Sequence, residues 1–351
     1  MNDLSPRTLT SAADLAAAGL VAADEAAEVA RVTARYAVAI PPAVHHLIRS
    51  AAQAPAIARQ FVPSVEELEL SPGENADPIG DHAHSPVKGI VHRYPDRVLL
   101  LPTLTCAVYC RFCFRREDVG TEGVLTPAEM DAALAYIRAT PSVWEVILTG
   151  GDPLVLSARR LGEIVRALDA IPQVQVIRVH TRVPVAAPER VGSALIAALK
   201  ATGKAVYVAI HCNHAEELTP AMRAACARLS DAGIPLLSQT VLLKDVNDSA
   251  DALEALMRAL VAARIRPYYL HQLDYAPGTG HFRVPLERGR AIVKALRGRL
   301  SGLAQPTYIL DIPGGAGKVP ITGAYVTEEN KGSYGIEDPQ GTFHAYPPRA
   351  E

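Results

Sequence analysis

Short apolar runs and helix-like segments alternate along most of this chain, beginning near residue 97. The apolar runs are nearly continuous, which is typical of strands buried on both faces of a parallel sheet. The candidate strands are 97–103, 145–149, 175–181, 205–212, 235–242, 267–273 and 307–311. The candidate helices between them are 126–139, 157–170, 187–200, 218–232, 249–263 and 285–299. Six strand–helix units and a final strand predict an α/β fold that closes, partly or nearly completely, into a (β/α) barrel.

The chain before residue 97 has a different pattern. Helix formers, mostly alanine, fill three stretches: 11–18, 22–36 and 42–54. The stretch from 64 to 96 is polar and is interrupted by proline and glycine, so we interpret it as an ordered segment that wraps toward the core, with a disordered linker as the alternative. The predicted organisation is an N-terminal helical extension, a wrapping segment, a barrel core and a tail: 1–63, 64–96, 97–320 and 321–351.

Polar residues gather where the candidate strands end. In parallel barrels and in doubly wound open sheets alike, the C-terminal ends of the strands carry the functional site. The pattern therefore supports one common site more firmly than it supports a closed barrel. The groups in question are the cysteines after residue 103, Gly150-Gly151-Asp152, His180-Thr181-Arg182, His211 to His214, Gln239, Asp274 and Asp311.

Three of the five cysteines, Cys106, Cys110 and Cys113, share one short loop. Three thiolates suit a 4Fe–4S cluster in which each cysteine holds one iron and the fourth iron stays open. Structural zinc is an alternative, but it needs four ligands, and no second Cys/His pair lies at finger-like spacing. Buried packing cysteines are the other alternative, which the arginines at 111, 115 and 116 disfavour. We expect those arginines to lower the thiol pKa values.

Composition narrows the classes of function. The net charge of −2 gives no electrostatic footprint for nucleic acid or a membrane surface. The N-terminus has no basic start followed by a long apolar core, so we do not expect a signal peptide. An odd number of cysteines, three of them clustered, is not a disulfide framework, and we expect the protein in the reducing cytoplasm.

A glycine-rich turn runs from Asp311 through Gly314, Gly315 and Gly317 to Lys318. Glycines let the backbone approach a ligand closely, and the lysine can pair with a phosphate or form an imine. The turn is not a Walker loop, because its spacing differs and valine follows the lysine. A flexible turn with a solvated lysine is the alternative.

The spacing CxxxCxxC, with an aromatic residue before the last cysteine, resembles the signature of radical S-adenosylmethionine (SAM) enzymes. In that superfamily SAM binds the open iron, and an electron from the cluster releases a 5′-deoxyadenosyl radical. Further stretches, in the same order, resemble the lysine 2,3-aminomutase family. They are 85–97, 115–116, 150–152, 211–214, 268–274, 280–283 and 306–318.

This resemblance implies conversion of L-lysine to β-lysine with a 4Fe–4S cluster, SAM and pyridoxal phosphate (PLP). It implies that Lys318 forms the imine with PLP and that Cys106, Cys110 and Cys113 hold the cluster. The implied cofactor contacts are Arg93, Tyr94 and Arg97 near PLP and its phosphate, and Gly150, Gly151, Asp152, His211 and Gln239 at SAM. The implied substrate contacts are Arg115 at the carboxylate and Asp274 with Asp311 at the distal ammonium.

Several alternatives stay open. One alternative is a short paralogue that catalyses the same reaction to make β-lysine for the modification of elongation factor P. Another is a related protein that acts on a different amino acid or is catalytically silent. The family also implies a flavodoxin or ferredoxin as electron donor and a possible homo-oligomer. Longer members carry downstream cysteines for structural zinc, whereas this sequence has none after Cys226, which puts zinc-linked assembly in doubt.

Overall fold

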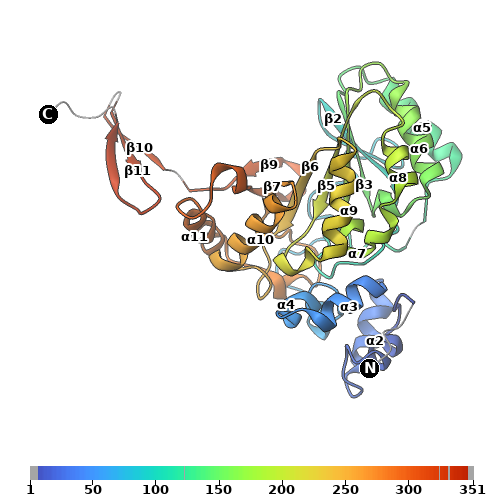
Figure 1. Cartoon of the computed structure of the whole chain (residues 1–351), viewed down its shortest axis with the longest axis horizontal. Coiled ribbons are helices and arrows are strands. Elements are labelled where there is room, and N and C mark those ends of the chain that lie inside the picture. The colour runs from blue at the N-terminus through green and yellow to red at the C-terminus, as the bar shows by residue number, and fades with distance from the viewer. Residues whose placement is uncertain (1–6, 122, 324, 331–332, 347–351) are drawn as a thin grey trace.

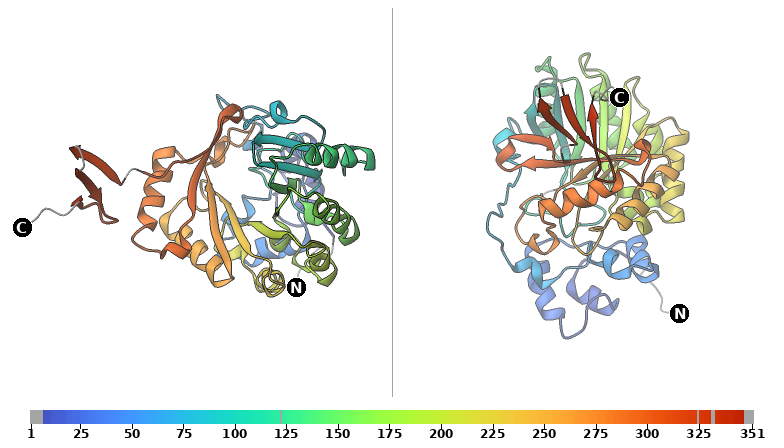
Figure 2. Two further views of the ribbon diagram at one scale, coloured as in Figure 1. Left: turned by 90° about the horizontal axis from the view of Figure 1, so that it is seen from above. Right: turned by 90° about the vertical axis from the view of Figure 1, so that its left-hand side faces the viewer.

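The structure is a computed structural model that describes residues 7–121, 123–323, 325–330 and 333–346. Its main sheet has nine strands in the order β1 to β9, and β2 to β8 are parallel. The sheet curves into a partial barrel, as seen from above in Figure 2. The strands are β1 (Ile90–Tyr94), β2 (Arg97–Thr103), β3 (Glu145–Gly150), β4 (Val176–Thr181), β5 (Ala205–His211), β6 (Leu236–Val241), β7 (Ile265–His271), β8 (Thr307–Ile312) and β9 (Gly317–Pro320). The seven predicted strands correspond to β2–β8, which confirms the predicted fold class.

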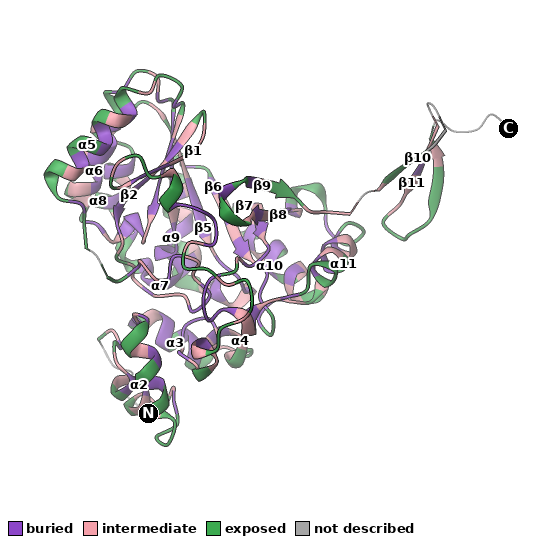
Figure 3. Ribbon diagram, turned by 180° about the vertical axis from the view of Figure 1, so that it is seen from behind, coloured by how far each residue is buried: buried purple, intermediate pink, exposed green. Residues whose placement is uncertain are grey.

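Six helices connect the parallel strands and lie on the outside of the curved sheet (Figure 1). Most begin at a side-chain cap, as α5 does, where Thr126 and Glu129 form a capping box. Their inward faces are buried and their outward faces exposed (Figure 3). They are α5 (Pro127–Arg138), α6 (Ala158–Asp169), α8 (Ser193–Leu199), α9 (Pro220–Asp231), α10 (Ala250–Ala262) and α11 (Leu286–Leu296).

One predicted helix, 187–200, is too long. The structure has instead a short α7 (Val183–Ala186), a 3₁₀ turn (Pro188–Arg190), and only then α8. Pro188 has no N–H to donate, and Gly192 precedes the first residue of α8, so the continuous helix breaks there.

The N-terminal extension packs against one end of the barrel. It contains α1 (Ala12–Ala17), α2 (Ala26–Arg35), α3 (Pro42–Ser50) and α4 (Ala54–Ala58). Apolar side chains of these helices share a buried cluster with Val108 of the cysteine loop and Ala186 of α7. The extension therefore covers the end of the barrel at which β2 and β4 finish (Figure 1).

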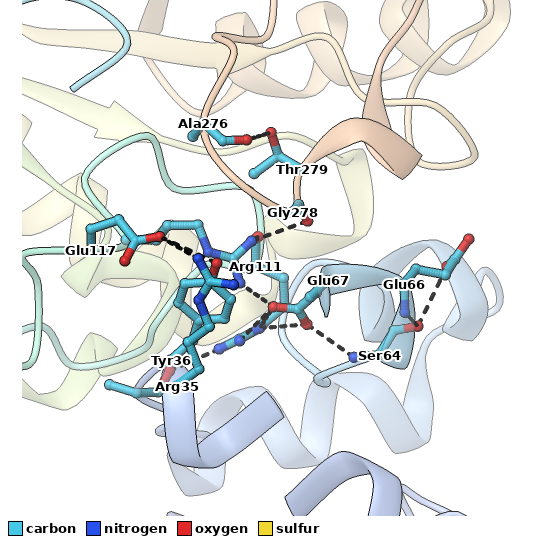
Figure 4. Close-up of polar contacts among 12 residues, drawn as sticks. Arg35, Tyr36, Ser64, Glu66, Glu67, Arg111, Glu117, Ala276, Gly278 and Thr279 are labelled. Carbon is cyan, nitrogen blue, oxygen red and sulfur yellow. Dashed lines mark hydrogen bonds and ion pairs between the residues drawn. The ribbon is translucent and has the colours of Figure 1, made fainter. Parts of the chain in front are cut away.

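The wrapping segment holds two 3₁₀ turns, Val65–Leu68 and His82–His84, and it ends in a strand that the sequence did not predict. Residues 90–94 form β1, which pairs antiparallel with β2 at the sheet edge. The segment is fixed to the barrel through Glu67, which is fully buried and accepts hydrogen bonds from Arg111 Nη2 at 2.6 Å and from the backbone N–H of Ser64 at 2.9 Å (Figure 4).

The tail was predicted without strands, but it forms a separate antiparallel sheet of β10 (Val326–Asn330), β11 (Ser333–Glu337) and β12 (Phe343–Tyr346). This sheet projects from the barrel beside α11 (Figure 1). Lys294 of α11 pairs with Glu337 at 2.5 Å, which ties the two parts together. No helix within the described ranges is both long and apolar enough to span a bilayer.

Candidate active site

Every residue to which the family resemblance assigns a cluster, cofactor or substrate contact lines one cavity of about 560 Å³. The cavity reaches from the cysteine loop at the C-terminal end of β2 to Glu145 at the start of β3. The structure therefore brings together the candidate cluster ligands, Lys318 and the two aspartates. Their individual roles stay predictions.

The three cysteines lie in the loop between β2 and α5, and all three are free and partly buried. No three His, Cys, Asp or Glu side chains in the described part of the chain surround a single ion position. Three thiols in one loop suit a multi-iron cluster, in which each sulfur binds a different iron.

Nearby arginines do lower the thiol pKa values of Cys106 and Cys113, as expected, but burial outweighs their effect. Burial raises the pKa of Cys106 well above its usual value and raises the pKa of Cys113 to about 11, and Arg115 offsets only part of this. Such thiols ionise when a bound metal supplies the compensating charge.

The flanking arginines contact other partners. Arg111 and Arg116 both pair with the buried carboxylate of Glu67, and Arg116 Nη1 also donates to the carbonyl of Gly278 at 3.2 Å (Figure 4). The guanidinium that does contact a cysteine sulfur in the described chain belongs to Arg182, directly after β4, whose Nη1 donates to Cys110 Sγ at 2.9 Å. The sequence placed Arg182 at a strand end but did not select it as a site residue.

The turn after β3 is packed tightly on the start of the cysteine loop. Gly150 has φ of 102°, and a Cβ at Gly151 would lie 2.4 Å from the carbonyl oxygen of Thr105, so both positions require glycine. The Asp152 carboxylate accepts hydrogen bonds from the Thr181 hydroxyl at 2.8 Å and from the backbone N–H of Arg182 at 2.7 Å. Asp152 therefore holds the turn against β4, although burial raises its pKa.

His211 and Gln239 are paired neighbours on β5 and β6. Nε2 of His211 is buried with no hydrogen-bond partner among the described residues, as is Nε2 of His180 on β4. Burial lowers the pKa of both histidines well below the usual value, so both are neutral. Two unpaired buried nitrogens facing a cavity are suited to contact a polar ligand.

Lys318 lies on β9 directly opposite Asp311 on β8. Its ammonium pairs with the Asp311 carboxylate, and its backbone N–H donates to the hydroxyl of Tyr94 at 2.8 Å. Burial raises the pKa of Asp311, but the hydrogen bond from His271 and the charge of Lys318 outweigh it and bring the value to about 2. Asp311 is therefore ionised and already has a cation.

Asp81 is a cavity residue that the sequence reasoning missed. One carboxylate oxygen lies 3.0 Å from Arg93 Nη2 and the other 2.6 Å from Arg115 Nη2, so this one acid pairs with both arginines. Arg97, the third predicted cofactor arginine, stacks over the Tyr94 ring at 3.8 Å. Asp81 lies in the wrapping segment, outside the candidate strands and their ends. Nothing in the sequence therefore indicated that this residue would reach the site.

Asp274, three residues after β7, has no such partner. Its Oδ1 is buried, and no described residue donates a hydrogen bond or an ion pair to the carboxylate. Burial, followed by the charge of Asp311, raises its pKa to about 7. An unpaired buried carboxylate beside an ionised one is a site for a cation.

The fold and the cysteine loop define a radical SAM protein, and residues 100–258 match the family model described as "Radical SAM superfamily". Members of this superfamily use a 4Fe–4S cluster and SAM.

Residues 293–348 match a second model, described as "Lysine-2,3-aminomutase". The L-lysine 2,3-aminomutase of Fusobacterium nucleatum is 40% identical over 92% of this chain and 76% of its own. That of Acetoanaerobium sticklandii is 42% identical over 83% of this chain and 70% of its own. The chain belongs to the lysine 2,3-aminomutase family.

Proposed function

We propose that this protein converts L-lysine to β-lysine, with PLP bound through Lys318. The observation that carries the proposal is the charge arrangement of the cavity. An unpaired buried carboxylate, Asp274, lies close enough to Asp311, Lys318 and Arg115 for their charges to affect its pKa. This cavity also contains the three cysteines.

The residues present fit the implied cofactors. The cysteine loop supplies three sulfurs for the cluster, and the Gly150-Gly151 turn, His211 and Gln239 line the same cavity, with an unpaired His211 nitrogen available to SAM. Lys318, Arg93 and Arg97 supply an amine and guanidinium groups of the kind that hold a phosphorylated aldehyde. When bound, the cluster and SAM supply the radical that removes hydrogen from substrate C3, and PLP supplies the imine through which the amino group migrates.

The protein's own groups bind and orient the substrate. We propose that Arg115 exchanges its partner Asp81 for the substrate carboxylate, for which its planar guanidinium is suited. Lys318 is now the cation of Asp311. With its nitrogen held by PLP, Lys318 would no longer place a free ammonium beside Asp311, and the ε-ammonium of lysine would lie between Asp311 and Asp274.

The test uses anaerobically purified protein with reconstituted cluster, PLP, SAM, dithionite and C2-deuterated L-lysine, followed by mass spectrometry of the amino acids. We expect β-lysine from L-lysine over many turnovers and no β-glutamate from L-glutamate, whose side-chain carboxylate the two aspartates repel. Absence of β-lysine with iron and PLP both bound would overturn the substrate assignment. Absence of bound PLP would overturn the assignment of Lys318. The electron donor, flavodoxin or ferredoxin, also stays a proposal, and replacing dithionite by either protein tests it.

A further inference from the structure

A buried arginine contacts one of the three candidate cluster ligands. Arg182 is only 6% exposed, and its Nη1 donates to Cys110 Sγ at 2.9 Å. Among the described residues, no guanidinium of the flanking arginines is hydrogen-bonded to a sulfur, because the Arg111 and Arg116 side chains pair with Glu67 and that of Arg115 pairs with Asp81. Arg115 contacts Cys113 through its backbone N–H alone.

The position of this guanidinium is fixed from several sides. Its Nη2 donates to Glu217 Oε2 and to Gln60 Oε1, each at 2.7 Å, and both of these residues are fully buried. Glu217 is itself held by the backbone N–H groups of Asn213 and His214, each at 2.9 Å. Cations held in place without water interact strongly with a nearby charge.

The contact has an electrochemical consequence. An N–H donor to a ligating sulfur withdraws electron density from an iron–sulfur cluster, and a fixed positive charge favours the state with the additional electron. Reduction adds one electron and no proton, so the effect appears directly in the reduction potential. We infer that Arg182 raises the reduction potential of the cluster and that Glu217, by compensating its charge, limits this rise.

This inference rests on the cluster that the proposed function requires, but it does not depend on PLP or on lysine as substrate. The direction of the change in reduction potential distinguishes an electrostatic role of these residues from a structural one. Removal of the positive charge in Arg182→Gln lowers the potential. Removal of the compensating negative charge in Glu217→Gln raises it, because the Arg182 guanidinium is then less neutralised.

The experiment is a redox titration of the reconstituted full chain, without SAM, PLP or lysine, followed by electron paramagnetic resonance of the reduced cluster. Iron content is measured first for each variant. At a fixed ambient potential we expect Arg182→Gln to lower the ratio of reduced to oxidised cluster about tenfold, which equals about 59 mV for one electron. Glu217→Gln raises the ratio.

The control is Arg178→Gln. Arg178 lines the same cavity but pairs with Glu145 at 3.0 Å, and its removal leaves the ratio of reduced to oxidised cluster within about threefold of the wild type.

Opposite shifts in the two variants support the inference. Shifts in the same direction, or unchanged potentials with full iron content, overturn it and leave a structural role for the network. If Arg182→Gln does not assemble a cluster, Glu217→Gln decides alone, since a potential that is not raised refutes the inference. Failure of lysine turnover with the expected shifts would instead count against the proposed function only.

Discussion

Replacement of Asp274 by asparagine tests the assignment of the substrate's ammonium site. The carboxylate is buried, unpaired and close to the ionised Asp311. In the proposed binding mode the ε-ammonium of lysine forms a charge-assisted hydrogen bond with Asp274, whereas asparagine would offer only a neutral acceptor of nearly the same shape. Loss of one partner of a buried charge pair costs about 2–4 kcal/mol, reduced here because Asp311 still contacts the ammonium. Since about 1.4 kcal/mol corresponds to a factor of ten, kcat/KM for L-lysine should fall about 30- to 1,000-fold.

The same carboxylate predicts a pH dependence. Its pKa in the free protein is raised to about 7, so below pH 7 it is mostly protonated and cannot pair with the ammonium. The charge of Lys318 lowers this pKa, so its loss on PLP binding would move the pKa of the holoenzyme upward from 7. As the pH rises through that pKa the carboxylate ionises, and kcat/KM, which reports groups of the free enzyme, increases before it levels off. His271, the neighbouring histidine, does not account for such a rise, because burial lowers its pKa below the usual value.

The assay measures initial rates of β-lysine formation between about pH 6 and 8.5, with cluster and PLP occupancy determined at each pH. The wild type should show the rise and Asp274→Asn should not. If the variant keeps wild-type kcat/KM, or loses activity but keeps the same rise, Asp274 does not bind the ammonium and the charge argument is wrong.

Three further substitutions test other parts of the site. Lys318→Ala should abolish the visible absorbance of lysine-bound PLP and leave iron content unchanged; retained absorbance would show that PLP binds elsewhere. Gly151→Ala should lower the free energy of unfolding by about 1–3 kcal/mol, because its Cβ would meet a backbone carbonyl at 2.4 Å, whereas Gly203→Ala, with nothing within 4 Å, should be neutral in the same denaturant titration. Glu67→Gln should cost about 3–5 kcal/mol because it leaves two buried arginines short of their anion, whereas Glu287→Gln at a mostly exposed pair should cost less than about 1 kcal/mol. Equal effects of Glu67→Gln and its control would contradict the assignment of Glu67 as the anchor of the wrapping segment.

The features that the sequence predicted well are those whose signal is local. A strand buried on both faces is a continuous apolar run, so β2–β8 could be placed to within a few residues, and the cysteine loop followed directly from spacing. The strands β10–β12 carry no such signal because their large apolar side chains are exposed: Val326 is 55% exposed and Phe343 is 63% exposed. Edge strand β1 is likewise half polar, with a burial pattern that fades from buried to intermediate along its length.

Ion pairs between distant residues could not be predicted in this way. The arginines beside the cysteines appeared to be their electrostatic partners, since nothing in a linear sequence shows the direction of a side chain in a tight loop. In the fold those arginine side chains pair with Glu67 and Asp81, which belong to the wrapping segment. The side-chain partner of Cys110 Sγ is Arg182, which follows β4 and lies 72 residues further along the chain. Pairs of this kind depend on tertiary packing that brings the segments together.

The charge balance of the cavity follows from those pairs and bears on substrate choice. The arginine and lysine side chains that line it each have an acidic partner: Arg93 and Arg115 with Asp81, Arg97 with Asp96, Arg178 with Glu145, Arg182 with Glu217, and Lys318 with Asp311. Asp152 is satisfied by Thr181 and backbone N–H groups, which leaves Asp274 as the lining carboxylate without a donor in the described chain. If Lys318 held PLP as proposed, Asp311 would lose the nearer of its cations and would keep Arg93 Nη1 at 3.8 Å. The pair then attracts a ligand with a positive group at that position, whereas an acidic amino acid would place a third negative charge there. This imbalance favours a basic amino acid as the substrate on physical grounds, independently of the names of the relatives.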